Sequence, residues 1–458
     1  MPTIVERFAA YAASVQTAAL PPEALHAATR SLVDWFAATV PGGIEPPATL
    51  LTEAFAEEID HGRAQLVPSG RRATARAAAF LNGAASHTIE FDDIYRDAIY
   101  HPGVVTVPAA LALAQTRGLS GAALLRAIVA GYEVGTRIGV AVNPAHYEFW
   151  HTTGTVGCFG AAAASASALG LDAARTAHAL ANAGTMAAGL QQAFRADCMG
   201  KPLHAAHGAE VGVTTALAAE RGVTGALDIL EGARGFGQAM SRNVDWEAAL
   251  ATLGTRFHIA SMTQKNHAAC GHIHAAIDAV MALREQHHLT EERVKRITAR
   301  TYGKALEVAG NTEARTVFQA KFSLPYCLAA AMVVGSVRVD AFTDERLKDP
   351  AIRRLMSRVE MAVEPKLDAA FPRQRAAVVE IETSDGRHLS HYAPTRKGDP
   401  DAPLNDAELN DKARELIAPM LGVAATTALL DALWNIERRG SVADLVPVLT
   451  SRYAGAAQ

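Results

Sequence analysis

Residues 155–171 read TVGCFGAAAASASALGL, a run built almost entirely from small side chains. Small residues at helical spacing let helix backbones approach closely, so this run predicts a buried helix packed tightly against other helices. It is also the most tempting candidate for a membrane span, but it is short, and Ala, Gly and Ser partition weakly into lipid. We therefore predict that close helix-on-helix packing decides the fold around this stretch.

A similar pattern extends through more than the first half of the chain. Two prolines, Pro21 and Pro22, mark the start of a helix. That helix places Leu25, Leu32 and Phe36 near one face. Further helices are predicted at 74–89, 107–116, 121–140, 156–169, 172–183 and 205–221. Half of the 458 residues are hydrophobic but only 6% are aromatic, which suits close-packed helices better than a β-sandwich.

After His288 the spacing of hydrophobic residues changes from a helical to a strand-like pattern. Residues 293–302 (RVKRITARTY) and 358–363 alternate like strands. Residues 377–392 carry the clearest strand pattern, in which Ser384-Asp385-Gly386 forms the turn of a hairpin. Helices plus antiparallel strands predict a compact α+β unit here.

Helices resume between and after these strands. They are expected at 320–334, 406–417 and 424–433. The first of them has its true start at Pro325. The predicted fold class is thus mainly α: a large all-α helical domain, 1–267 with 396–458, carries a smaller α+β domain, 268–395, as an insertion.

Charge and cysteine content narrow the class of protein. Lys and Arg total 43 against 47 Asp and Glu, a net charge of −4, which argues against a nucleic-acid binder and against an acidic disordered chain. The cysteines Cys158, Cys198, Cys270 and Cys327 form no Cys-x-x-Cys pair, so neither a disulfide framework nor a zinc ribbon is predicted. With no long apolar segment of a signal peptide at the N-terminus, a cytoplasmic location is expected.

Titratable side chains gather beside several predicted helix ends. In the first group, Glu90, Asp92 and Asp93 precede His101, which Pro102 places on a loop. Charged groups at the mouth of an apolar helix indicate a cleft. A helix cap with surface carboxylates explains the same pattern equally well.

Two further groups open Ala-rich helices. His151 and Thr153 lie at the start of one, where hydroxyls and free backbone N–H groups suit a carboxylate, and ordinary capping by Thr is the alternative. Lys201 and His204, in KPLH, lie at the start of another. A cation there opposes the helix dipole, which points to a role, although a surface Lys is the commoner outcome.

The fourth group is KNHAACGHIH at 265–274, which contains Lys265 and Cys270. No His-Glu-x-x-His or Cys-x-x-Cys pattern accompanies it, so we predict no metal. Tyr326 opens an apolar helix, where its hydroxyl is either a proton donor or purely structural. No nucleotide-binding or nucleophile-elbow motif occurs, so no cofactor is predicted. The remaining Lys, His, Tyr and carboxylates suit an anionic substrate and proton transfer at carbon.

Five stretches, in this order, resemble the MmgE/PrpD family, which includes 2-methylcitrate dehydratase, cis-aconitate decarboxylase and iminodisuccinate epimerase. They are EFDDIYRDAIYHPGVVTVPAALALA, HTTGTVGCFGAAAASASALGL, KPLHAAHGAEVGVTTALAAERGVTGALDILEGARGFG, KNHAACGHIHAAIDAV and the late KGDP, and they span roughly residues 20 to 420. The resemblance implies a large all-α domain, a smaller α+β lid, an active site between them and a homodimer. It also implies that the protein uses neither a metal nor an organic cofactor.

The resemblance also implies roles for particular residues. The catalytic set would be His101, His151, Lys201, Tyr326 and Asp93. His151 or His101 would move the carbon-bound proton, Tyr326 would donate or relay a proton, and Asp93 would orient a His. Lys201 and Lys265 would hold substrate carboxylates, and Glu90 falls where decarboxylase relatives carry an acidic residue. The predicted substrate-binding set is Lys265, Glu90, His204, Thr153 and Cys270.

Departures from the family pattern leave the reaction open. Methylcitrate dehydratases follow the His-Pro pair with a Ser-Asp type sequence, whereas this chain has Gly103-Val104. KPLH resembles the decarboxylase branch, but that branch places a His where this chain has Cys270, and KNHAACGHIH is closer to the epimerase-like branch. We expect a lyase for a small di- or tricarboxylate, methylcitrate- or aconitate-like, acting as dehydratase or decarboxylase. Epimerisation and a catalytically inactive scaffold are the alternatives, and no nucleic acid or membrane is expected as a partner.

Overall fold

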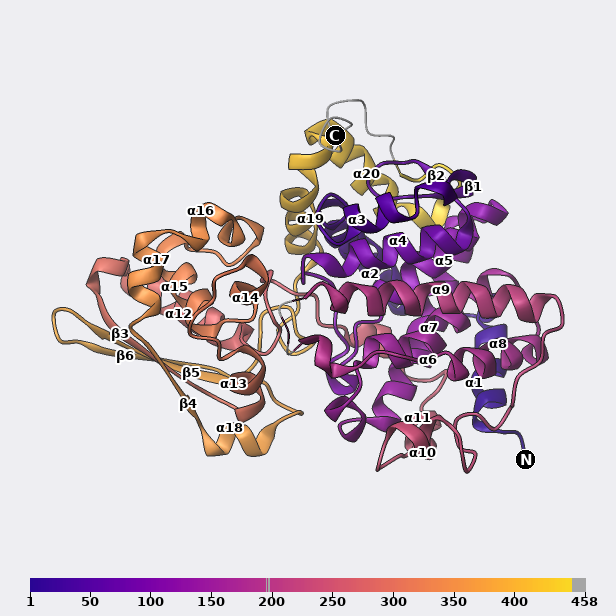
Figure 1. Ribbon diagram of the computed structural model, residues 1–458, viewed down its shortest axis with the longest axis horizontal. Helices are drawn as coiled ribbons and strands as arrows, with labels where there is room; N and C mark the ends of the chain where they lie inside the picture. The colour runs from indigo at the N-terminus through magenta and orange to yellow at the C-terminus, as the bar shows by residue number, and fades with distance from the viewer. Residues whose placement is uncertain (195, 197, 447–458) are drawn as a thin grey trace. The chain divides into compact units, whose positions relative to one another are not determined.

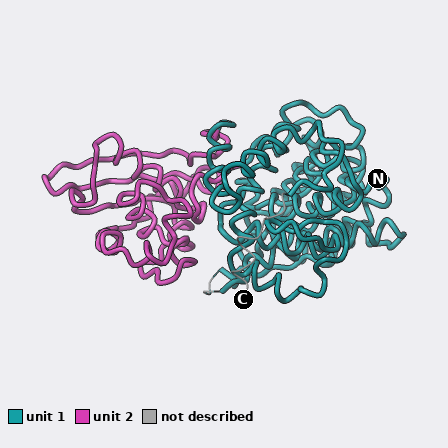
Figure 2. Tube along the Cα trace, turned by 90° about the horizontal axis from the view of Figure 1, so that it is seen from above, with its two compact units in different colours: residues 1–262, 405–458 teal, residues 263–404 magenta. Residues whose placement is uncertain are grey.

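The computed structural model describes residues 1–194, 196 and 198–446 (Figure 1). The chain forms two compact units, coloured separately in Figure 2. Unit 1 consists of Met1–Met262 and Asn405–Gln458, and unit 2 consists of Thr263–Leu404.

Unit 1 is built mainly from helices. They are α1 (Ile4–Ser14), α2 (Pro22–Gly42), α3 (Ala48–Ala54), α4 (Ala75–Thr88), α5 (Gly103–Arg117), α6 (Gly121–Val142), α7 (Thr152–Ala168), α8 (Ala173–Thr185), α9 (Gly200–Glu220), α10 (Phe236–Met240), α11 (Trp246–Leu250), α19 (Asp406–Leu421) and α20 (Val423–Trp434). The predicted helices are confirmed, although α5, α7 and α9 each begin four or five residues earlier than expected. Those extra turns matter because they carry several of the candidate site residues.

The Ala-rich helix α7 lies at the centre of unit 1. It packs against α5, α6, α8 and α9, and all 17 of its residues are buried. A Cβ on Gly212 of α9 would lie 2.4 Å from the carbonyl carbon of Ala161, so a glycine is needed where these two helices touch. In the described part of the chain, no helix is long and apolar enough to cross a bilayer.

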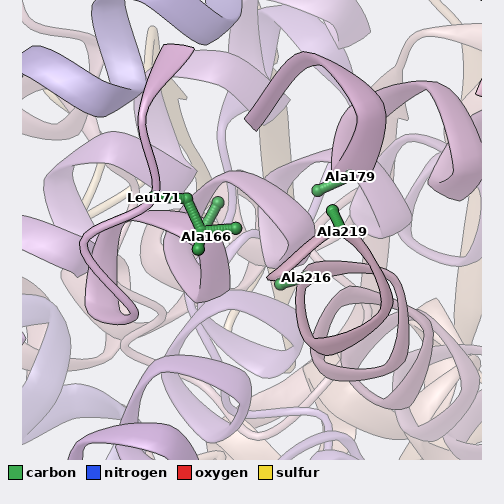
Figure 3. Close-up of a cluster of buried hydrophobic side chains, with 5 residues drawn as sticks. All are labelled: Ala166, Leu171, Ala179, Ala216 and Ala219. Atoms are coloured by element: carbon green, nitrogen blue, oxygen red, sulfur yellow. The ribbon is translucent and has the colours of Figure 1, made fainter. Parts of the chain in front are cut away.

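Small side chains also fill the layer between α7, α8 and α9. Ala166, Ala179, Ala216 and Ala219 pack there with Leu171, each at most 6% exposed (Figure 3). Because an alanine side chain is only a methyl group, the contact brings the helix axes close together. The packing that the sequence predicted around 155–171 is therefore confirmed.

A small antiparallel strand pair interrupts the helices of unit 1. It is formed by β1 (Ile59–Gln65) and β2 (Arg72–Ala73). The prediction of a mainly α chain with an all-α large domain is therefore wrong: about 59% of the structure is helix and about 10% strand, a mixed α/β content that is rich in helix. The run IDHGRAQ has four consecutive exposed residues and includes the left-handed Asp60, so it lacks the period-two alternation from which a strand can be predicted.

Unit 2 contains a four-stranded sheet in the order β4-β3-β5-β6. Its strands are β3 (Val294–Thr301), β4 (Val359–Val363), β5 (Ala377–Thr383) and β6 (His388–Ala393). The three predicted strand regions and the hairpin are confirmed, and Gly386 has the positive φ of 87° that the turn requires. The expectation of only antiparallel pairing is wrong, because β3 and β4 are parallel. The chain between them crosses over through helices rather than through a tight turn.

Unit 2 also contains helices, some of which pack on the sheet. They are α12 (His274–His287), α13 (Gly303–Ala309), α14 (Val317–Lys321), α15 (Leu324–Val334), α16 (Asp344–Leu347), α17 (Pro350–Met356) and α18 (Pro365–Ala370). Helix α12 packs on β5 and β6, and α15 packs on α12, α17 and β4. Pro325 lies in the first turn of α15, which confirms the predicted helix start.

Candidate functional site

Buried polar side chains of unit 1 meet where several helices begin or end. His87 lies in the last turn of α4, and His101 comes just before α5. His151 is the N-cap residue of α7, and Lys201 lies in the first turn of α9. The His101 ring centre is 4.7 Å from that of His87 and 6.3 Å from that of His151. The structure thus brings together groups that are far apart in the sequence.

Asp92 holds two of these histidines. Its Oδ1 is 3.1 Å from Nδ1 of His87, and its Oδ2 is 2.6 Å from Nδ1 of His101. An ionised carboxylate only accepts hydrogen bonds, so each imidazole donates from Nδ1 and, when neutral, keeps a lone pair on Nε2. Among the described residues, Nε2 of His87 has no hydrogen-bond partner, although the side chain is fully buried. Asp92 therefore sets both the orientation and the tautomer of the two rings.

His151 is paired with His204 of α9. Their Nδ1 atoms lie 3.0 Å apart, so one ring donates a hydrogen bond and the other accepts it. The backbone N–H of His151 donates to the carbonyl oxygen of Gly189 at 2.8 Å, and the Phe194 ring packs edge-on against the imidazole at 4.7 Å. These contacts fix the His151 ring beside that of His101.

Burial makes the histidines weak bases. It lowers the pKa of His101 to about 3, although the neighbouring Asp92 carboxylate favours the charged ring. Burial and then the positive charge of nearby groups lower the pKa of His204 to about 4. Burial, followed by the neighbouring His204, brings the pKa of His151 well below 6.5. At neutral pH these rings are uncharged and able to accept a proton.

Lys201 and Glu90 form a buried ion pair in the same region. Their side chains are only 6% and 5% exposed. The ammonium group also lies over the Phe194 ring, 5.7 Å from its centre. Glu90 adopts a left-handed backbone conformation, with φ of 61°, directly after α4. The pair thus holds a buried cation beside a carboxylate that neutralises it.

Asp93 and Thr153 have different surroundings from those expected. Asp93 accepts hydrogen bonds from the Tyr132 hydroxyl at 2.7 Å and from the backbone N–H of Gly103 at 3.0 Å, and burial raises its pKa to about 8. The expectation that Asp93 orients a His is therefore wrong, because Asp92 makes those contacts. The Thr153 hydroxyl accepts a hydrogen bond from the backbone N–H of His101 at 3.3 Å. It thereby ties the His101 loop to the first turn of α7.

The remaining predicted site residues belong to unit 2. Lys265 is 1% exposed and Cys270 is a buried free thiol. Tyr326 is fully buried in α15, where its hydroxyl donates to the carbonyl oxygen of Ala341 at 2.7 Å, and burial raises its pKa well above 10. This hydroxyl is thus already engaged with the backbone.

The histidines of KNHAACGHIH each have a separate hydrogen-bond partner. Nε2 of His267 lies 2.8 Å from Asp278, Nδ1 of His272 lies 2.9 Å from the Tyr302 hydroxyl, and Nε2 of His274 lies 3.1 Å from the Ala269 carbonyl. Among the described residues, the group whose ligand atoms come close enough for a metal is instead His87, His101 and His151.

Two residues of the cluster were missed as site residues by sequence reasoning. Asp92 stood in the quoted EFDD stretch, but nothing in the pattern distinguished it from Asp93. His87 is a polar residue in the last turn of an Ala-rich helix, only three residues before Glu90. That proximity was the available hint, since the helix must end where the acidic loop begins.

The fold and the cluster together define a two-unit protein whose helix-rich unit buries histidines, carboxylates and a lysine at its helix ends. Two family profiles match this chain: the MmgE/PrpD N-terminal domain over residues 6–249 and the MmgE/PrpD C-terminal domain over residues 267–436. The chain belongs to the MmgE/PrpD family, as the resemblance indicated.

Curated relatives carry decarboxylase names. The chain is 26% identical to the cis-aconitate decarboxylase-like protein oryM of Aspergillus oryzae, over 94% of both chains. It is 28% identical to the human cis-aconitate decarboxylase, over 79% of this chain and 76% of that one. It is 24% identical to the cis-aconitate decarboxylase of Aspergillus terreus, over 96% of this chain and 94% of that one.

Proposed function

We propose that the protein is a lyase that acts on a small tricarboxylate and moves a proton at a carbon next to a carboxylate. The observation that carries the proposal is the pair of uncharged rings, His101 and His151, with centres 6.3 Å apart in the region of the Lys201 cation. The names of the relatives make decarboxylation of cis-aconitate the first reaction to test. Dehydration of a methylcitrate-like substrate is the second.

Both reactions need a group that stores one proton. In decarboxylation, the carbon–carbon bond to the departing carboxylate breaks and its electron pair forms a new double bond. The electron pair of the old double bond then takes a proton at carbon. In dehydration, a base removes the proton from carbon, the electron pair of that bond forms the double bond, and the hydroxyl takes up a proton and leaves as water. An imidazole that is neutral in the free protein can remove the proton in the dehydration directly. In the decarboxylation it can deliver a proton to carbon only after it has itself gained one.

Substrate binding supplies the negative charge that makes protonation of an imidazole favourable. A tricarboxylate brings several negative charges close to His101 and His151. Opposite charge within about 4–6 Å stabilises an imidazolium, so the pKa of both rings rises when the anion enters. Lys201 binds one of the carboxylates in place of Glu90, and Asp92 keeps the reactive nitrogen of His101 pointed at the substrate.

Other assignments rest on the sequence resemblance. We propose that Lys265, Tyr326 and Cys270 contribute to substrate binding or proton relay, that the chain works as a homodimer, and that turnover needs neither metal nor cofactor. The cytoplasmic location is a separate proposal, which rests on cysteines that form no disulfide framework. The named relatives are decarboxylases, so the comparisons lend no support to epimerisation.

The test is a panel of cis-aconitate, methylcitrate, citrate and iminodisuccinate, each followed by NMR in deuterated water. Loss of carbon dioxide from cis-aconitate, with deuterium on the carbon next to a carboxylate, is the expected result. Dehydration of methylcitrate would assign the second reaction, and exchange without net reaction in iminodisuccinate would assign epimerisation instead. No reaction with any member of the panel would overturn the proposal.

Substitutions connect the reaction to the cluster. His151→Gln and Lys201→Met should each lower kcat/KM by at least about 100-fold, because each removes a group that contacts the reacting substrate. Arg117→Met is the matched control, since Arg117 pairs with Glu220 at the exposed end of the same helical unit. Turnover at the wild-type level in the first two variants would separate the activity from this site.

A further inference from the structure

Three histidines of unit 1 converge in a way that the proposed reaction does not require. His87, His101 and His151 each offer one ring nitrogen, and these nitrogens all lie within 4.8 Å of one another. The rings of His87 and His151 are nearly parallel, with centres 5.8 Å apart, and His101 lies edge-on to His87. Proton transfer needs one or two imidazoles, so the third ring calls for a separate explanation.

His87 is the distinctive member of this set. Its side chain is fully buried, and its Nε2 has no hydrogen-bond partner in the part of the chain that the structure describes. A buried polar atom left unpaired costs about 1–3 kcal/mol. Because Asp92 takes the Nδ1 hydrogen, the unpaired atom of the neutral ring is a lone pair, which is the form that binds a metal ion.

The surroundings match the arrangement that supports histidine ligands in metal sites. Such ligands usually donate their second ring nitrogen to a carboxylate, and Asp92 accepts from both His87 and His101. His151 can likewise donate a hydrogen bond from its Nδ1 to a partner, which here is His204.

The distances allow a compact ion after a small adjustment. Zinc binds imidazole nitrogen at about 2.0–2.1 Å, which places tetrahedral ligand atoms about 3.4 Å apart. The three nitrogens must therefore approach one another by up to about 1.4 Å when the ion binds. Three histidines leave the fourth zinc position open for water or a carboxylate.

We propose that His87, His101 and His151 form a binding site for Zn²⁺ or a similar transition-metal ion, and that the bound ion inhibits the enzyme. Binding follows from the geometry alone. Inhibition rests on the proposed function, because the ion ties up the lone pairs of His101 and His151 that would otherwise handle the proton. The site is therefore a point at which metal availability controls a reaction that itself uses no metal.

Cobalt binding tests the site without any assay of turnover. Co²⁺ titrated into the full-length protein should reach one ion per chain and give the intense visible bands of four-coordinate cobalt, which Zn²⁺ should abolish by displacement. His87→Gln should weaken binding by at least about 100-fold and remove those bands, because one of three protein ligands is lost. His207→Gln is the matched control: that ring is on α9 but bonds the Met186 carbonyl, and its loss should change neither quantity.

Each result is decisive. Absence of the bands in the wild type, or equal Co²⁺ affinity in wild type and His87→Gln, would overturn the site. If Co²⁺ binds as expected but Zn²⁺ leaves turnover unchanged, the inhibitory role is wrong. If Co²⁺ binds as expected and no carboxylate of the panel reacts, the proposed function fails while the metal site stands.

Discussion

Replacing Lys412 by Met tests how the C-terminal helices hold the candidate site. Lys412 of α19 is fully buried, and its Nζ donates to Asp34 Oδ1 at 2.7 Å and to the carbonyl oxygen of Phe91 at 2.9 Å. It also lies 4.2 Å from the centre of the Phe91 ring. Phe91 stands between Glu90 and Asp92, so this lysine anchors the loop that carries both.

The expected loss of stability follows from the buried groups that the substitution leaves without a partner. Met keeps the side-chain volume, so packing changes little. Asp34 loses its cation, however, and its Oδ2 already has no hydrogen-bond partner among the residues that the structure describes. Breaking a buried ion pair by removing one partner costs about 3–5 kcal/mol. Burial raises the pKa of Asp34 even beside Lys412, so the carboxyl protonates in the variant and limits the loss. We expect a decrease of about 4 kcal/mol in the free energy of unfolding.

The double variant Lys412→Met with Asp34→Asn should be more stable than the single variant by about 2 kcal/mol, because the uncompensated carboxylate is gone. Urea unfolding followed by circular dichroism and by the fluorescence of the neighbouring, buried Trp35 measures both differences. Arg117→Met, which breaks an exposed pair with Glu220, is the control and should change stability by less than about 1 kcal/mol. A single variant within about 1 kcal/mol of wild type, or a double variant no more stable than the single, would refute the reasoning.

Three further outcomes are expected. Asp92→Asn should lower kcat by at least about 100-fold with an unchanged circular dichroism spectrum, because the His101 tautomer is no longer fixed; wild-type kcat would contradict this. Burial raises the pKa of Asp93 to about 8, so between about pH 4 and pH 8 the folded chain binds a proton that the unfolded chain lacks. Wild-type stability relative to Asp93→Asn should therefore fall as pH rises through that range, as measured by urea unfolding at several pH values, and parallel curves would count against it. Calorimetry in buffers of different ionisation enthalpy should show uptake of about one proton when a tricarboxylate binds at neutral pH; identical heats would mean that the histidines stay neutral.

Local pattern was enough to predict most elements but not every pairing between them. Helix α7 and the β5–β6 hairpin follow from periodicity and turn chemistry, which act over a few neighbouring residues. The β1–β2 pair has no such pattern, because β1 contains four consecutive exposed residues and β2 has only two residues. The parallel pairing of β3 with β4 depends on where the intervening helices pack.

The candidate site, too, could be predicted from the sequence only in part. The residue types and order in the chain pointed to His101, His151 and Lys201, and the structure places them in one buried region. Which of two adjacent carboxylates faces the histidines could not be predicted, because one step along an irregular loop turns a side chain to a different neighbour. The structure selects Asp92 for the histidines and Asp93 for Tyr132.

The sequence by itself thus determined the family, the close-packed helices and the chemical groups available, since these depend on residue identity and local spacing. Only the tertiary structure decided that His87 stacks with His151, that Asp92 serves two rings, and that Lys201 pairs with Glu90. Each of these contacts joins residues on different helices or loops. They form because α4, α5, α7 and α9 pack against one another, and that packing is a property of the whole helical unit.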